Sequence, residues 1–287
     1  MHIIWYIIVC MTPMITQNME LKINTDSYIL NDDTQAVKRL DLLNEEDNER
    51  SKSFICQLPI KKDFHILSVG AGIGTMELWM AKELIPLGIM HITDKSKKFL
   101  NIAQERAIQQ DIHNVYFTHV DVHTLSTNPK YDLIYARYLL QHVPNATEAL
   151  KKLCSALKTD GLLIIEDEDF YQTRLEPYHP IMPVITNVAQ EIASLYKIDF
   201  GIGPKIANLI QQQPGMIIKK EINFESKSGK QGVLLLKDTI AETSEKLTKQ
   251  NIQINHIPSI LQTLNILINQ DYSIITCNYQ LCAKRVV

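Results

Sequence analysis

The chain lacks dense clusters of basic residues. It has 287 residues, with 29 Lys plus Arg against 32 Asp plus Glu, which gives a net charge of −3. Affinity for a phosphate backbone depends on gathered cations, so we expect no nucleic acid partner. Short basic pairs such as Lys97-Lys98 are expected to lie on solvated faces.

Cysteine is also sparse, with five residues and no CxxC pair. An odd number without paired spacing argues against a disulfide framework and against a zinc knuckle. A reducing compartment suits this pattern best, and we predict a cytoplasmic protein.

A long apolar run is missing from the start of the chain. The stretch from Ile3 to Met11 covers nine residues, which is too short to span a bilayer, and it lacks the basic segment and cleavage site of a signal peptide. We therefore expect no stable membrane insertion. We also expect translation to begin at Met11, Met14 or Met19, which would leave residues 1–18 wholly or partly outside the native protein. An anchor or signal is the alternative.

Apolar strands and amphipathic helices alternate from His65 onward. Five strands are predicted, at 66–69, 89–93, 115–120, 131–135 and 162–165. This alternation indicates βαβ units and an α/β fold with a doubly wound, Rossmann-like parallel sheet. Later stretches are expected to form helices at 184–197, after Pro204, at 233–249 and at 258–268, and strands at 216–224 and 273–284.

The predicted domain organisation has two parts. Residues 1–59 contain a helical pattern at 33–58 and are expected to cover the ligand site, with Tyr28 near it. Residues 60–287 form the main domain, with helical insertions at about 171–213 and 231–270. In an open α/β sheet, inserted material can fold over the carboxyl ends of the strands, where ligands bind. We interpret both insertions as a substrate cap, and plain core helices are the alternative.

The segment "HILSVGAGIGTMELWMAKEL", residues 65–84, joins a strand to a helix through a glycine loop. Gly70, Gly72 and Gly74 follow GxGxG, whereas a dinucleotide loop needs GxGxxG, whose last glycine would fall at Thr75. Glycines at 70 and 72 let the backbone pass close to a ligand, which can be an amino acid joined to a ribose. Asp94 follows the second strand, where a carboxylate can accept both ribose hydroxyls. NAD enzymes share this last feature.

Asp121-Val122, after the third strand, suits the amine and the face of an adenine. With Asp121-Val122 added to the glycine loop and Asp94, the chain resembles the class I S-adenosylmethionine-dependent methyltransferases over about residues 60–170. The matching motifs are "ILSVGAGIG", "HITDKSKKFLNIA", "VYFTHVDV" and "YDLIYARYLLQHVPNATEALKKLCSALKTDGLLIIEDED". Less specifically, "YILNDDTQAVKRL" and "DFGIGPKIANLI" look like segments of bacterial members that act on small molecules.

The resemblance implies a cofactor, S-adenosyl-L-methionine, and a set of residues that bind it. These are Ser68, Gly70, Ala71, Gly72, Gly74, Asp94, Lys95, Asp121, Val122, Ala136 and Arg137. Ser68 departs from the family, which usually has Asp or Glu there to orient the methionine end of the cofactor. Serine can donate and accept hydrogen bonds, so we still expect binding.

The predicted reaction is in-line transfer of a methyl group to a small-molecule acceptor. His142, by resemblance near the transferred methyl, is a candidate for a general base. The run "EDED", Glu166 to Asp169, at the end of the fifth strand can offer a carboxylate to the acceptor, and we select Glu166 and Asp167 from it. The chain has no Asn-Pro-Pro-Tyr and no Pro-Cys, which favours a small molecule over an amide or a nucleobase as the acceptor. A non-catalytic binding or regulatory protein of this fold and an NAD-binding oxidoreductase are the alternatives.

The pattern "HVDVH" imitates a metal site, because His119, Asp121 and His123 would point to one face of a strand. No further ligand cluster lies near it in the sequence, and Asp121 already has a role that agrees with two other motifs. We therefore predict no metal.

Overall fold

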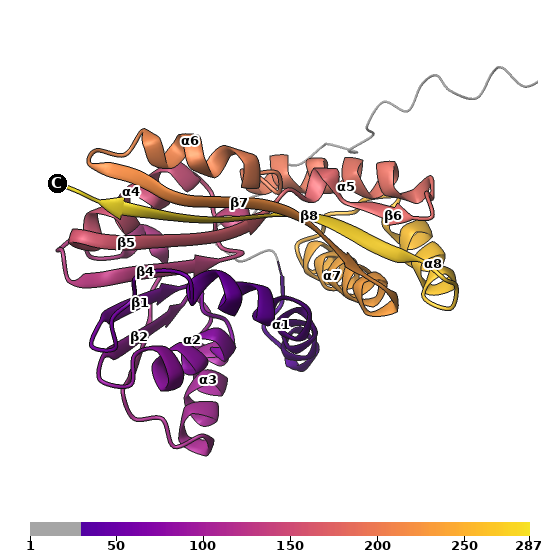
Figure 1. The fold of residues 1–287 in the computed structure, drawn as a ribbon. Coiled ribbons are helices and arrows are strands. Elements are labelled where there is room, and N and C mark those ends of the chain that lie inside the picture. The colour runs from indigo at the N-terminus through magenta and orange to yellow at the C-terminus, as the bar shows by residue number, and fades with distance from the viewer. Residues whose placement is uncertain (1–29) are drawn as a thin grey trace, which may run out of the picture.

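The computed structural model describes residues 30–287; the expected start sites and Tyr28 lie outside the described residues. The centre of the fold is an eight-stranded sheet in the order β3-β2-β1-β4-β5-β8-β6, with β7 paired to β8 (Figure 1). The strands are β1 (His65–Val69), β2 (Ile89–Asp94), β3 (Val115–His119), β4 (Tyr131–Arg137), β5 (Leu157–Glu168), β6 (Arg174–Glu176), β7 (Met216–Ser228) and β8 (Ser273–Arg285).

The five predicted strands form the parallel part of this sheet. Strands β1 to β5 pair in parallel, and β8 lies antiparallel between β5 and β7. Strand β5 begins earlier than expected, at Leu157, and includes Asp160 and Gly161. Asp160 has a left-handed φ of 67°, close to the point where the β4–β5 register shifts. The predicted Rossmann-like α/β sheet is therefore confirmed.

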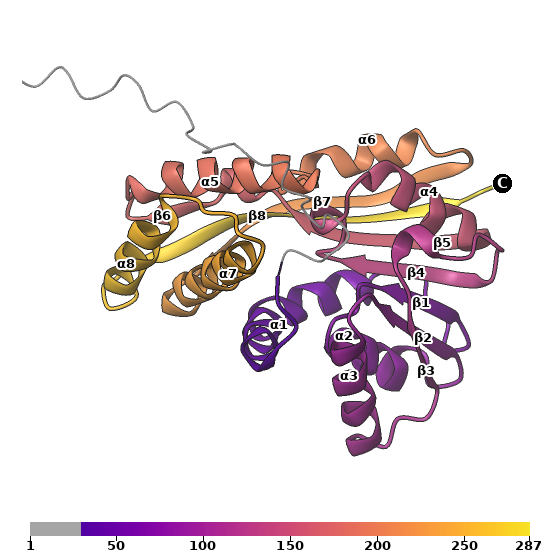
Figure 2. The same cartoon turned by 180° about the vertical axis from the view of Figure 1, so that it is seen from behind.

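Helices cover both faces of the sheet (Figure 2). They are α1 (Thr34–Ile55), α2 (Thr75–Trp79), α3 (Lys97–Gln109), α4 (Ala146–Ala156), α5 (Ile181–Tyr196), α6 (Ile206–Gln211), α7 (Lys230–Lys249) and α8 (Ile257–Leu267). Helices α4 and α6 pack on one face, and α2, α3 and the end of α1 pack on the other. Alternate residues of β5 pack on the two faces: Ile165 packs on the face covered by α4 and α6, and Ile164 packs on the face covered by α2 and α3.

Local sequence signals fix the helix starts. Ser96 caps α3 by accepting a hydrogen bond from the backbone N–H of Phe99. Asp33 caps α1 in the same way. Helix α2 continues as a π-helical turn at Met80–Leu84, and Met76 and Met80 are buried.

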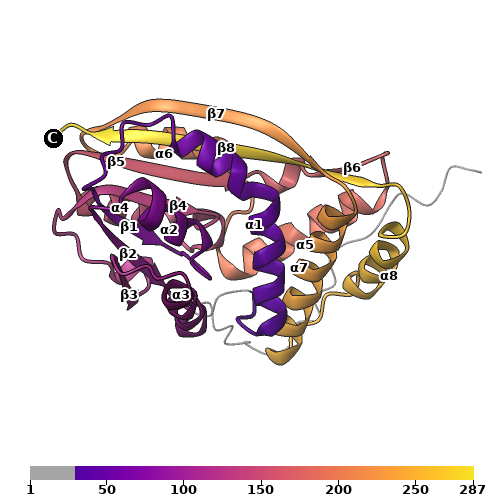
Figure 3. The ribbon, with the colours of Figure 1, turned by 60° about the horizontal axis from the view of Figure 1, so that its bottom comes forward.

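A third apolar cluster lies beyond the sheet and joins α5, α7 and α8 to Leu175 and Ile274, on the far ends of β6 and β8. Figure 3 shows α1 running beside α7, so that α1 spans from the sheet to this third cluster. Of the segment 171–213, α5 belongs to the third cluster, whereas α6 packs with α4 against the sheet. Within residues 30–287, no helix combines the length and apolar character needed to cross a bilayer.

Candidate functional site

One cavity of about 720 Å³ lies between the carboxyl ends of the parallel strands and the helices α1, α5, α7 and α8. Most of the predicted cofactor residues meet in its wall. They are Gly70, Ala71, Gly72, Asp94, Lys95, Asp121, Val122 and Arg137. Residues more than 60 positions apart in the sequence thus form one surface, because parallel strands end at the same edge.

The glycine loop requires its glycines for two different reasons. Gly72 has a φ of +57°, and a side chain there would project toward α1, where Leu40 is the nearest contact at 3.5 Å. Gly74 has a φ of +76°, and its added Cβ would lie 2.7 Å from the Cβ of Ala103. Gly72 therefore keeps the backbone open toward the cavity, whereas Gly74, which does not line the cavity, permits close packing of α2 on α3.

Asp94 is held in place by two backbone donors. Its Oδ2 accepts from the N–H of Gly72 at 2.8 Å, and its Oδ1 accepts from the N–H of Ser96 at 2.7 Å. Burial raises the pKa of Asp94 despite these bonds. Each carboxylate oxygen keeps a second lone pair, so the pair can still accept the two hydroxyls of a ribose.

Asp121 and Lys95, which follow neighbouring strands, form an ion pair with an Nζ–Oδ2 distance of 2.9 Å. Asp121 also accepts a hydrogen bond from the backbone N–H of His123, which fixes the turn that carries Val122. His119 contacts the backbone oxygen of Lys95 at 2.8 Å. In the described part of the chain, no group of three or more His, Cys, Asp or Glu side chains is placed to hold a metal ion.

The serine that departs from the family pattern is paired with an acid from another element. Ser68 is buried, and its Oγ donates to Oε1 of Glu77 at 2.7 Å. Glu77 lies in the first turn of α2, is itself buried and lines the cavity, whereas Ser68 does not. Sequence reasoning did not select Glu77; an acid inside the apolar face of a helix is the signal that could have found it.

Arg137 enters the cavity from the end of β4. Its guanidinium donates hydrogen bonds to Asn44, Asn48 and Ser51 of α1, all of which are neutral side chains. The guanidinium also lies close enough to Glu166 and Glu77 to interact electrostatically with both carboxyl groups. Ala136, the preceding residue, is buried outside the cavity wall.

Two of the three predicted bases do not reach the cavity wall. Glu166 accepts from Ser51, Tyr135 and Gln280 at 2.8, 2.7 and 2.6 Å. Asp167 points to the other face of β5, where it accepts from the backbone N–H of Leu140 at 2.9 Å. Both carboxylates serve internal structure.

Glu168, one residue farther along β5, does line the cavity. Burial, together with the nearby charge of Asp47, raises the pKa of Glu168 to about 7, although Gln141 donates a hydrogen bond to it. His142 also lines the cavity, but burial and the charge of Arg39 lower its pKa to about 3. At neutral pH His142 is therefore uncharged, whereas Glu168 is partly ionised.

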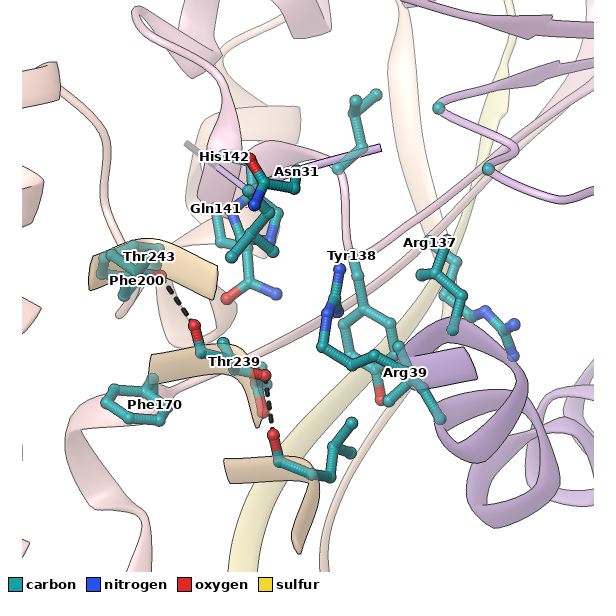
Figure 4. Close-up of a pocket in the computed structure, with 18 of the residues that line it drawn as sticks. Asn31, Arg39, Arg137, Tyr138, Gln141, His142, Phe170, Phe200, Thr239 and Thr243 are labelled. Atoms are coloured by element: carbon teal, nitrogen blue, oxygen red, sulfur yellow. Dashed lines mark hydrogen bonds between the residues drawn. The ribbon is translucent and has the colours of Figure 1, made fainter. Parts of the chain in front are cut away.

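The side of the cavity away from the glycine loop is mainly apolar. Figure 4 shows Phe170 and Phe200 on this side, near Thr239 and Thr243 of α7. The two threonine hydroxyls donate to backbone oxygens one helical turn earlier, each at 2.8 Å. Aliphatic side chains complete the wall: Ile185, Val188 and Ile192 of α5, Leu236 of α7, and Ile257 and Ile260 of α8.

Comparison with known proteins places these features in a family. Residues 60–262 match the family model described as a methyltransferase domain. Demethylmenaquinone methyltransferase of Listeria monocytogenes is 27% identical over 109 residues, which are 38% of this chain and 46% of that protein. (S)-Coclaurine N-methyltransferase of Papaver somniferum is 26% identical over 122 residues, or 42% of this chain and 34% of that protein.

A solved structure extends the likeness over most of the fold. The YcgJ protein from Bacillus subtilis superimposes with a TM-score of 0.56 and 15% sequence identity, covering 82% of this chain and 97% of that chain. At this identity the likeness concerns the fold alone. The chain spans less than half the length of the two curated relatives named above.

Proposed function

Because the chain belongs to the methyltransferase-domain family and has the class I S-adenosylmethionine-dependent methyltransferase fold, we propose that it transfers a methyl group from S-adenosylmethionine to a small-molecule acceptor. One observation carries this proposal: the glycine loop, Asp94 and Asp121 line the same cavity as an apolar wall built by α5, α7 and α8. A methyl donor and an apolar acceptor can therefore meet in one cavity.

The residues present fit the cofactor. Asp94 is placed to accept the ribose hydroxyls, and Asp121 with Val122 borders the space for the adenine. Gly72 leaves the backbone open, and Arg137 and Glu77 offer opposite charges to a methionine carboxylate and amine. We assign to Glu77 the role that an acid at position 68 has in the family. When bound, S-adenosylmethionine supplies an activated methyl group, so the protein has to align the acceptor and exclude water.

We assign acceptor selection to the cap, meaning α5, α7 and α8 together with the start of α1. Their wall is apolar, which favours a small, largely apolar acceptor over nucleic acid. A cytoplasmic location remains part of the proposal, as the cysteine pattern suggested.

Glu168 is the general base that the geometry favours, in place of Glu166 and Asp167. It lines the cavity, and with a pKa of about 7 it is about half ionised at neutral pH. His142, kept neutral, contacts the edge of Phe200 at 5.8 Å between ring centroids and borders the same space. We assign it to acceptor positioning.

Calorimetry with S-adenosylhomocysteine and NAD tests the cofactor assignment. We expect S-adenosylhomocysteine to bind and NAD not to bind, because the loop lacks the third glycine of the dinucleotide pattern. The protein is then incubated with labelled S-adenosylmethionine and a metabolite extract, and products that gain one methyl group are identified. Binding of NAD alone would refute the cofactor, and cofactor binding without any methylated product would indicate a binding protein.

A further inference from the structure

The guanidinium of Arg39 has a buried nitrogen without a partner. Its Nε donates to both carboxylate oxygens of Glu242, each at 3.1 Å, and the two side chains are 5% and 3% exposed. Its Nη2 has no hydrogen-bond partner among residues 30–287. A buried donor left unpaired destabilises the fold, so such a group calls for an explanation.

The unpaired nitrogen belongs to a side chain that lines the cavity. In Figure 4 the Arg39 side chain lies next to Tyr138, across the cavity from Gln141 and His142. The charge of Arg39 contributes to the lowered pKa of His142, which agrees with this placement. A ligand in the cavity can therefore reach Arg39.

Helix α1 separates this contact from the cofactor loop. Leu40 faces Gly72, and the preceding residue of a helix points about 100° away around the axis. Arg39 is thus turned from the glycine loop toward α7, where it meets Glu242. The acceptor side of the cavity, not the cofactor side, contains the unpaired nitrogen.

A second polar atom is in the same condition. The hydroxyl of Thr173, 5% exposed, lines the cavity and has no partner within residues 30–287. Two buried polar groups without a protein partner in one cavity wall are what a site built around a polar ligand contains.

The charge and hydrogen-bonding capacity of Arg39 limit which functional groups of a ligand can pair with it. Glu242 already neutralises the guanidinium through a buried ion pair, so a full anion gains little from Arg39. The free Nη2–H needs an acceptor atom, and a protonated amine offers none. A carbonyl, enol or phenol oxygen does.

We propose that Arg39 donates a hydrogen bond from Nη2 to an oxygen of the methyl acceptor, so that the acceptor is an apolar molecule with a carbonyl or hydroxyl oxygen, not an amine. This proposal rests on the proposed methyltransferase function. In this proposal Arg39 positions the acceptor, and the hydroxyl of Thr173 can form a hydrogen bond with a second polar group of the same molecule.

The test uses three probes that differ in one group: 2-acetylnaphthalene, 2-ethylnaphthalene and 2-(aminomethyl)naphthalene. Their affinities are measured by fluorescence titration on the full chain saturated with S-adenosylhomocysteine. We expect the acetyl compound to bind about 10-fold tighter than the ethyl compound, and the amine not to exceed the ethyl compound.

The variant Arg39→Lys removes the second nitrogen but keeps a cation for Glu242, so that the fold is preserved. It should abolish the acetyl preference while leaving the affinity for S-adenosylhomocysteine unchanged. Lys38→Met, which removes an exposed cation from the adjacent position of α1, should change neither.

Three results would overturn the proposal: an acetyl preference that persists in Arg39→Lys, a preference for the amine, or no binding of any probe to the cofactor-saturated protein. Loss of S-adenosylhomocysteine affinity in Arg39→Lys, with the probe preference retained, would place the guanidinium in the cofactor site. Failure of the wild type to bind S-adenosylhomocysteine would instead refute the proposed function.

Discussion

Replacing Glu168 by Gln tests the cavity-lining carboxyl group that we assign as the general base. Burial, with the charges of Asp47 and Asp169, raises the pKa of Glu168 to about 7 from an ordinary 4.5. Between these two values the folded protein keeps a proton that the unfolded chain releases. The contribution of this group to the free energy of unfolding is therefore fully present below about pH 4.5 and is lost as the pH rises through about 7.

The magnitude follows from the size of the shift. At about 1.36 kcal/mol per pKa unit, the ionised carboxyl destabilises the fold by about 3 kcal/mol above pH 8, and a neutral amide avoids this cost. Relative to wild type, Glu168→Gln should therefore gain about 3 kcal/mol between about pH 4.5 and pH 8.5. Urea unfolding of the cofactor-free protein at several pH values measures the gain. Glu49→Gln, at an exposed position of α1, is the matched control.

Activity gives the second measurement on the same variant. For the wild type, kcat/KM should rise with pH through about 7 as Glu168 loses its proton. Glu168→Gln should lower kcat by about 100-fold or more and remove this rise. A variant with near-wild-type kcat and an unchanged pH profile, or with no pH-dependent gain in stability, would refute the assignment of a buried base.

Three other substitutions test the remaining parts of the site. Asp94→Ala should weaken S-adenosylhomocysteine by about 2–3 kcal/mol in calorimetry, because charge-assisted hydrogen bonds to a ribose are lost; an unchanged Kd would move the ribose elsewhere. Glu77→Gln should weaken the cofactor about 10-fold while Ser68→Ala has a smaller effect, as expected if the acid and not the serine contacts the ligand; equal effects would contradict this order. Glu242→Leu should lower the free energy of unfolding by about 3 kcal/mol, since Arg39 is left buried without its counter-charge; a smaller loss in urea unfolding would mean that water reaches Arg39.

The parts of the fold and site that follow from local sequence were predictable. The order of strands from β1 to β5 follows from alternating apolar runs, and Asp94 and Asp121 were selected because each immediately follows one of them. The end of a parallel strand is a position that a sequence reveals directly. The family resemblance then added the cofactor.

The acceptor side was not predictable in the same way. Glu166 and Glu168 are the same residue type in the same strand. Which of them lies at the cavity depends on how far β5 extends, and the pairing of β5 with β8 decides that length. Arg39 lies in α1, and its partner Glu242 is 203 residues away. Such contacts depend on how distant helices pack, and no local pattern records them.

Strands β7 and β8 run continuously from the centre of the sheet to the third apolar cluster (Figure 3). The amino half of β8 pairs with β6 beside the cap, while its carboxyl half pairs with β5 in the centre of the sheet. The cap and the half of the sheet that carries the glycine loop are therefore joined by two continuous strands at this point, not by a flexible linker. A rigid-body swing of the cap would bend both strands, so we expect the two halves to keep their relative position and to unfold in one cooperative transition.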